Sequence, residues 1–398
     1  MEENNLEGRV ELKLIDITNV KGDRKESMLE IFLSINIYED LFLPYKTGKI
    51  TVQDTNDLQS TFPIIGGEKL EVLYRTENDK KPKVQTFKIY KLDEDQATTQ
   101  SGENKKTLTL YFVSEEQELD SRIKISKHYK GDPNSIIQSI LKSELKSKKP
   151  FVYDSASAIP DFCANFWTPS KTINFISRST TAGNRSDFVF FEDKEGFNFK
   201  TISGLMEKPK ISDLKFEDQL ESKWDWNIIQ RFKVSKYFDT LQTDTLGNTV
   251  FQFDNEKYKF TVEQEDFESI SQHATNHGLN VQFHKDFLSN PNILTTFKDN
   301  RYIAKRDQLL RTIDKYHMVI QMTGDSTKTV GQVYNIEIRT KQRENSFPNQ
   351  LLTGNWLITN VRHEIGRTGA YMQNLKCVKN AFFKLNETSK VKGKKNVL

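Results

Sequence analysis

The chain has 398 residues, of which 36% are hydrophobic and 28% are charged, and its formal net charge is +3 at pH 7. This length exceeds one ordinary core and predicts two to four packed units. The C-terminal end holds five lysines against one glutamate: Lys384, Lys390, Lys392, Lys394, Lys395 and Glu387. That end has a net charge of +4, which leaves a net charge of −1 on the rest of the chain. The rest of the chain therefore lacks the basic excess that is typical of nucleic-acid-binding proteins. We expect residues 385–398 to be a disordered basic tail.

Composition also argues against membranes and metal or disulfide frameworks. No stretch approaches the roughly 20 apolar residues of a membrane helix, and Met1 to Gly8 lacks the apolar core of a signal peptide. The two cysteines, Cys163 and Cys377, are far apart and show no metal-ligand spacing. We expect assembly in a reducing cytoplasm without stable membrane insertion.

Alternation of apolar and polar residues predicts strands over the first 110 or so residues, separated by clusters of Gly, Asn and Asp. The predicted strands are Val10–Ile17, Met28–Ile37, Lys49–Val52, Leu70–Tyr74, Val84–Leu92 and Leu108–Phe112. Gly66-Gly67 supplies a turn with free backbone choice. This pattern indicates a compact antiparallel β unit.

Helix signals occupy the middle of the chain. Asp132-Pro133 and Thr168-Pro169 each pair a capping residue with a proline that suits the first helical position. Apolar stripes predict two further helices, over Asp266–His277 and Tyr302–Tyr316. Alternation returns in Tyr334–Ile338, Trp356–Ile358 and Tyr371–Val378. Strands at both ends with helices between them predict an α+β protein with two β units.

The sequence contains few motifs that are typical of enzymes. It has no nucleophile elbow, Walker A loop, dinucleotide fingerprint or H-E-x-x-H motif. His273 and His277, spaced i, i+4 on a predicted helix, and the later His284 are the best metal candidates. Because His277 continues an apolar stripe and no Glu lies between the pair, we favour a packing role. We predict no catalytic, cofactor-binding or metal-binding residue and no cofactor.

Acidic runs offer pairs of carboxylates at Glu115, Glu116, Glu118, Asp120, Glu192, Asp193 and Glu195. A glycosidase needs two carboxylates at a fixed separation across a cleft, which closeness in sequence does not show. We therefore expect these acidic runs to lie on solvent-exposed faces or in loops at the ends of strands.

Cysteine and tryptophan positions also favour packing. Cys377 alternates with Leu375 and should face a core, and we expect Cys163 to be buried as well. We expect core or subunit-interface roles rather than sugar binding for Trp167, Trp224, Trp226 and Trp356.

Two segments resemble a known family. The first runs from Ile37-Tyr38-Glu39-Asp40-Leu41 through Gly48–Asp54 to Phe62–Val72 and includes Gly66-Gly67-Glu68. The second combines Gly331–Ile336, Gly354–Glu364 and Tyr371–Leu375, with Val330-Gly331 where the family usually has Pro-Gly. This order of features is similar to that of the central baseplate hub proteins of T-even-like contractile phages, which are related to the hub domains of injection-system spike proteins.

The resemblance implies two tube-like antiparallel β-barrel domains, a mixed helical insertion domain and a trimeric, pseudo-hexameric ring. The implied divisions are 8–117 for the first tube-like domain, 118–225 and 255–305 for the insertion, and 226–254 and 306–384 for the second tube-like domain. It also implies a virion structural protein, not an enzyme, that joins the hexameric tail tube to the trimeric central spike. We expect the strands around Lys49–Gln53 and Tyr334–Ile338 to form interfaces by edge pairing.

The partners implied are two further copies of the chain, a spike or tail-lysozyme-type protein, a tube or tube-initiator protein and baseplate wedge proteins. Two alternatives stay open: a hub or spike component of a contractile secretion or injection system, and a tail-associated glycan-degrading or glycan-binding protein.

Overall fold

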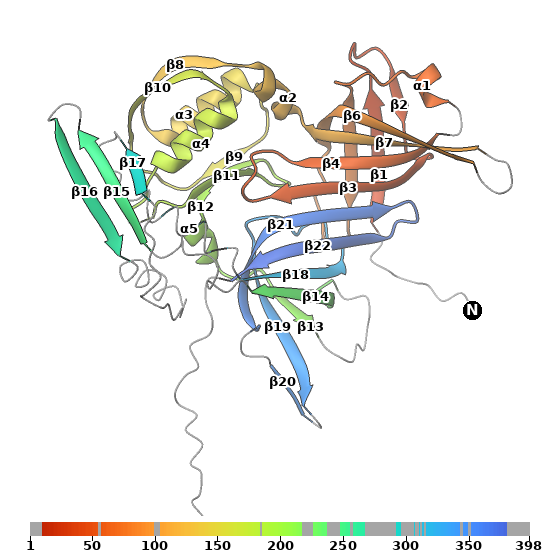
Figure 1. Cartoon of the computed structure of the whole chain (residues 1–398). Coiled ribbons are helices and arrows are strands. Elements are labelled where there is room, and N and C mark those ends of the chain that lie inside the picture. Colours follow the sequence, from red (N-terminus) through yellow and green to blue (C-terminus); the bar gives the residue numbers. More distant parts are fainter. Residues whose placement is uncertain are drawn as a thin grey trace, which may run out of the picture.

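The computed structural model shows a mostly antiparallel β protein with few helices (Figure 1). It describes residues 10–54, 57–98, 104–183, 185–216, 226–236, 247–254, 258–266, 292–295, 316–342, 345–348 and 352–379, together with Arg306, Leu310 and Ile313. Among these residues, no helix has the length and apolar character needed to cross a membrane.

Fourteen strands from two regions of the chain form one sheet. The first β region contributes β1 (Glu11–Thr18), β2 (Lys25–Ser27), β3 (Phe32–Asp40), β4 (Thr47–Asp54), β5 (Lys69–Arg75), β6 (Gln85–Thr98) and β7 (Asn104–Ser114). The second β region contributes β13 (Asp213–Phe216), β14 (Ile229–Lys236), β18 (Tyr316–Thr323), β19 (Val333–Gln342), β20 (Asn345–Pro348), β21 (Gly354–Gly366) and β22 (Tyr371–Val378). The predicted strands at both ends of the chain are therefore confirmed.

Strand alternation places one face of this sheet against two apolar cores. In β4, buried Gly48, Ile50 and Val52 alternate with half-buried Lys49 and Thr51. One core lies under the first β region and another under the second. The two regions join where β3 pairs antiparallel with β21, so strands from opposite ends of the chain lie side by side (Figure 1).

The middle of the chain mixes short helices with small sheets. It contains α2 (Glu115–Arg122), β8 (Ile125–Gly131), α3 (Pro133–Ser139), β9 (Phe151–Tyr153), β10 (Ile159–Trp167), α4 (Pro169–Ser179), β11 (Phe188–Glu192), β12 (Phe197–Thr201) and α5 (Ile202–Met206). Strands β10 and β8 form one sheet, and β11, β12 and β9 form another. A third core is built by helices α3 and α4 together with four phenylalanines of β11 and β12: Phe188, Phe190, Phe197 and Phe199.

Both predicted helix starts are confirmed. The Asp132 carboxylate accepts a hydrogen bond from the Ser135 amide at 2.8 Å, and the Thr168 hydroxyl accepts one from the Lys171 amide at 3.1 Å. Helix α3 continues into a π-helical turn at Ile140–Glu144.

The other two predicted helices fall largely outside the described residues. Asp266 is the last residue of strand β16 (Lys259–Asp266), which pairs with β15 (Gly247–Asp254), and β15 also pairs with β17 (Asn292–Thr295). In the Tyr302–Tyr316 segment, Arg306, Leu310 and Ile313 are helical, whereas Tyr316 already begins strand β18. A short helix, α1 (Leu58–Thr61), follows β4.

Candidate functional site: a buried polar seam and a polar sheet face

The seam between the two β regions carries residues from both family-like segments. Glu39 comes from β3, His363 from β21, and Tyr371 and Gln373 from β22. The Nε2 atom of His363 lies 3.6 Å from a Glu39 carboxylate oxygen, and its Nδ1 lies 2.6 Å from the Tyr371 hydroxyl. All four side chains are buried, so this polar group sits inside the join.

Polar groups surround the Nδ1 side of the imidazole. The Gln373 side-chain oxygen accepts from the Asp325 amide at 2.9 Å, so the Gln373 nitrogen faces His363 Nδ1 at 3.0 Å. The same nitrogen donates to the Asp325 carbonyl at 2.9 Å and lies 3.1 Å from the Tyr371 hydroxyl, so Gln373 links the imidazole to the loop after β18. Burial opposes ionisation of Glu39, but His363, Lys46 and a hydrogen bond from Thr329 outweigh it and lower the pKa of Glu39 below its usual value.

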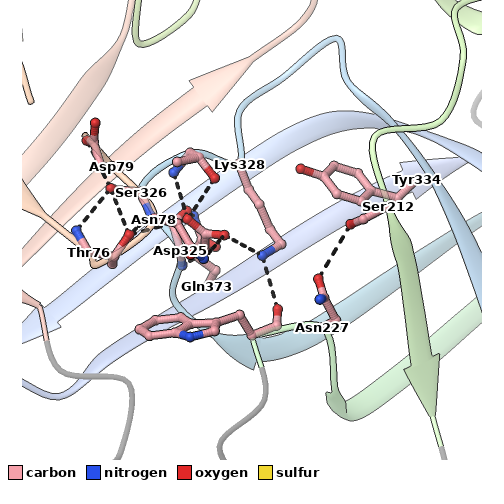
Figure 2. Close-up of polar contacts among 12 residues, drawn as sticks. Thr76, Asn78, Asp79, Ser212, Asn227, Asp325, Ser326, Lys328, Tyr334 and Gln373 are labelled. Carbon is pink, nitrogen blue, oxygen red and sulfur yellow. Dashed lines mark hydrogen bonds and ion pairs between the residues drawn. The ribbon is translucent and has the colours of Figure 1, made fainter. Parts of the chain in front are cut away.

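A second buried network ties the loops after β5 and β18 together (Figure 2). The Thr76 and Ser326 hydroxyls lie 3.0 Å apart, and the Ser326 hydroxyl donates to the Asp79 carboxylate at 3.1 Å. Lys328, only 2% exposed, donates to the Asp325 carboxylate at 2.9 Å and to the Trp226 carbonyl at 3.0 Å. The first and second β regions are therefore joined by side-chain bonds as well as by the sheet.

Lys194 brings the middle of the chain into this network. It lies in the turn between β11 and β12, forms an ion pair with Asp79 and donates to the Ser326 carbonyl at 3.0 Å. The Lys194 and Asp79 side chains are only 9% and 8% exposed. One ammonium group thus contacts both β regions from the middle of the chain.

A charged cleft of about 700 Å³ lies beside this turn, between the first β region and the middle of the chain. Lys149 donates to Glu116 at 2.6 Å and to Glu192 at 2.7 Å, while the backbone amide of Lys46 donates to Glu192 at 3.0 Å. Burial disfavours the Lys149 charge, yet Glu192 and Glu116 outweigh it and raise the pKa of Lys149.

The prediction that the acidic runs are solvated is wrong for three carboxylates. Glu116, Asp120 and Glu192 are 4%, 8% and 1% exposed. Asp120 accepts from the amide of Ser170, in the first turn of α4, at 2.6 Å. The runs lie where three elements converge, and each buried carboxylate has a partner there, which a one-dimensional charge pattern does not show.

Of the two predictions for the cysteines, one is confirmed and the other is wrong. Cys377 is buried in the second core, as expected. Cys163 is exposed, which contradicts the expectation, because Phe162 and Ala164 take the core-facing positions of β10 and leave Cys163 on the outer face.

Of the predicted packing tryptophans, Trp356 is fully buried, and Trp167 packs against Phe162 and Phe175. Trp226 is half-buried, and Trp224 lies outside the described residues. His273, His277 and His284 lie outside them too. Within the described part of the chain, no group of three or more His, Cys, Asp or Glu residues is placed to hold a metal.

The predicted edge-pairing segments are not free edges. Strand β4, which contains Lys49–Gln53, pairs with β3 on one side and β7 on the other. In β19, residues Tyr334–Ile338 pair with β21 and β13. Alternation identified both segments as strands, but the order of strands in a sheet is a long-range property.

A polar face was not predicted. Eight strands follow one another in the order β14-β18-β22-β21-β3-β4-β7-β6 and cross both β regions. Paired residues share a face, so registers trace rows across the sheet. One row reads Glu364, Asn36, Lys49, Tyr111 and Lys91 on five successive strands.

Other positions on this face are also mostly polar, and the apolar exceptions include Val113, Val319, Met372 and Val378. The polar positions include Gln321, Asn374, Arg362, Tyr38 and Thr47 in a second row. The opposite face of the same strands carries the two apolar cores. One side of the sheet is therefore built for burial and the other for contact with water or a polar partner.

Comparisons with solved structures agree with this architecture. The tail protein from Neisseria meningitidis MC58 aligns with a TM-score of 0.59 at 12% identity, covering 93% of this chain and 97% of that chain. The 43 kDa tail protein of prophage MuSo2 from Shewanella oneidensis aligns with a TM-score of 0.58 at 10% identity, covering 92% and 98%. A chain of the lidded Francisella PdpA-VgrG complex gives 0.50 at 12%, covering 95% and 54%.

The chain has the fold of phage tail proteins. Two of its structural neighbours are tail proteins, in agreement with the resemblance in the sequence. No protein-family model matches the chain, and no curated protein matches it in sequence.

Proposed function

We propose that this chain is a structural baseplate hub protein, three copies of which form a ring between the hexameric tail tube and the trimeric central spike of a contractile phage tail. The observation that carries the proposal is the polar face that runs over eight strands and both β regions. A sheet with its cores on one side and a mostly polar face on the other suits the wall of a water-filled channel.

The ring proposal assigns roles to the parts of the chain. Residues 8–117 form the first tube-like β domain, and residues 226–254 and 306–384 form the second. Residues 118–225 and 255–305 form the insertion domain on the outside of the ring. The spike, the tube or tube initiator and the baseplate wedges are the partners, and the site of action is the baseplate of the virion, assembled in the host cytoplasm.

Negative-stain electron microscopy and native mass spectrometry of the purified full-length chain test this proposal. We expect open rings of threefold or sixfold appearance and a mass of three chains. A folded chain that stays monomeric over the whole accessible concentration range contradicts it.

A hub in a contractile injection machine is the second candidate. It is favoured by the alignment of 95% of this chain with about half of a chain in the Francisella VgrG complex. Co-purification separates the two, because a phage hub binds a separately encoded phage spike, whereas an injection-system hub binds components of that system.

Glycan hydrolysis is a weaker reading of the charged cleft. Glu116 and Glu192 both form ion pairs with the ammonium group of Lys149. These ion pairs give the two carboxylates a structural role. Incubation of the purified chain with bacterial cell walls, followed by turbidity, tests this reading, and clearing of the suspension would overturn the assignment as a non-enzyme.

A further inference from the structure

The row of eight strands has two open ends. At one end, β14 pairs with β18 along Ile229–Lys236, and among the described residues β13 reaches the start of its other edge through a single bridge between Lys215 and Ile228. At the other end, β5 pairs with β6 over Gln85–Lys88, and the backbone of Ile89 still bonds to Gly67 and Glu68, so the outer part of β6 from Lys91 onward pairs only with β7 in the described part of the chain. An unpaired strand edge presents backbone donors and acceptors to any strand that approaches it.

The topology fixes how two such ends would meet. All seven pairings in the row are antiparallel, so the first and last of its eight strands run in opposite directions. A rotation axis that runs along the strands leaves strand direction unchanged. In a ring of copies, β6 of one copy therefore meets β14 of the next in antiparallel orientation.

The side chains on the two edges are complementary in charge. On the polar face, β14 presents exposed Arg231 and Lys233, and β6 presents exposed Asp93 and Asp95. Each pair is spaced by two residues, which is the side-chain period of one strand face. An antiparallel register that sets Lys233 opposite Asp93 also sets Arg231 opposite Asp95.

The same register also sets residues of the opposite face against each other, with Phe232 opposite the exposed Glu94. It places Val234 opposite Leu92, and these two residues pack at the borders of the second and the first core, respectively. Lys91, whose ammonium lies 2.9 Å from Asp93 in the single chain, falls opposite Ser235. The register therefore joins one apolar pair, Val234 and Leu92, below the sheet and two opposite-charge pairs above it.

Resting on the proposed ring, we propose that neighbouring copies of this chain join by antiparallel pairing of β14 with β6, in the register set by Lys233–Asp93 and Arg231–Asp95. Opposite charges across paired strands stabilise the sheet, whereas like charges destabilise it. Two copies meeting through β14 alone would set cations against cations. The charge pattern thus favours a head-to-tail ring over a symmetric dimer.

Charge reversal in the full-length chain tests the edges. The variants are Arg231→Glu with Lys233→Glu, Asp93→Lys with Asp95→Lys, and all four changes together. We expect each pair of changes to weaken trimer formation by about ten-fold or more in native mass spectrometry, and the four changes together to restore it. Lys130→Glu with Lys171→Glu, both exposed on the middle part, is the matched control and leaves the trimer intact.

Disulfide trapping tests the register. In a Cys163→Ser background, Lys233→Cys and Asp93→Cys proteins are mixed and oxidised, and a cross-linked pair is expected only in the mixture. Lys233→Cys mixed with Gln96→Cys, which is three residues out of register, is expected to remain uncross-linked.

The outcomes separate the two proposals. Trimers that tolerate charge reversal and fail to cross-link overturn the edge pairing and leave the ring standing. A wild-type chain that is folded by circular dichroism but never forms trimers overturns both.

Discussion

His363 and Glu39 face each other inside the seam between β21 and β3, with the imidazole Nε2 3.6 Å from the carboxylate and both side chains 2% exposed. They come from the two family-like segments at opposite ends of the sequence. The pair therefore stabilises the join of the two β regions, not either region alone.

The seam predicts an acid-sensitive contribution to stability. The pKa of Glu39 is lower in the folded protein than its usual value of 4.5, so the ionised carboxylate stabilises the fold above about pH 4.5. This stabilisation is lost as the pH falls through the folded pKa. Glu39→Gln is expected to lower the free energy of unfolding at pH 7 by about 1–3 kcal/mol, with a smaller deficit at pH 3–4.

Urea unfolding of wild type and Glu39→Gln across pH 3–8 measures this difference. Glu364→Gln is the control, because that carboxylate is 42% exposed beside Arg362. A loss in the free energy of unfolding that stays constant from pH 3 to pH 8 would show that the charge of the Glu39 carboxylate does not cause it.

Lys194 is expected to hold three parts of the chain together. Replacing it by Met leaves the buried Asp79 carboxylate without its ammonium partner and is expected to cost about 3–5 kcal/mol. Asp79→Asn in the same background should recover part of that loss, because the uncompensated charge is gone. A double-mutant cycle by chemical denaturation measures the coupling, and strictly additive effects would show that the ion pair contributes nothing.

Gly48 is expected to be irreplaceable in the centre of β4. A Cβ there would lie 2.3 Å from the Phe112 ring and 2.5 Å from the Asn36 carbonyl oxygen. Gly48→Ala should destabilise the fold by at least about 1–3 kcal/mol, since the ring is buried and the carbonyl belongs to β3. Gly366→Ala is the control, with its nearest neighbour at 3.8 Å, and thermal unfolding of both variants should separate them.

The two cysteines are expected to differ in thiol reactivity. Cys163 is exposed on β10, whereas Cys377 is 1% exposed in the second core, where burial raises the pKa of its thiol. A chromogenic disulfide reagent should titrate one thiol in the native protein and two after denaturation. Cys163→Ser should abolish the native signal, and a residual fast signal would show that the second core opens.

The sequence alone was enough to predict the strands at both ends and the starts of α3 and α4. Those features depend on neighbours within a few residues: the period of two in Gly48–Val52, and the caps that Asp132 and Thr168 give to the next turn. The family-like order of segments also pointed to the tail fold that the structural neighbours share.

Only the tertiary structure decided which residues meet. Glu39 and His363 become neighbours because β3 pairs with β21, and Glu116 and Glu192 are buried because Lys149 reaches both. The same long-range pairing encloses β4 and, within the described part of the chain, leaves most of β14 and the part of β6 from Lys91 onward at the ends of the row of strands. Local periodicity sets which face of a strand is apolar, but strand order, and with it every contact between distant segments, is set by packing of the whole chain.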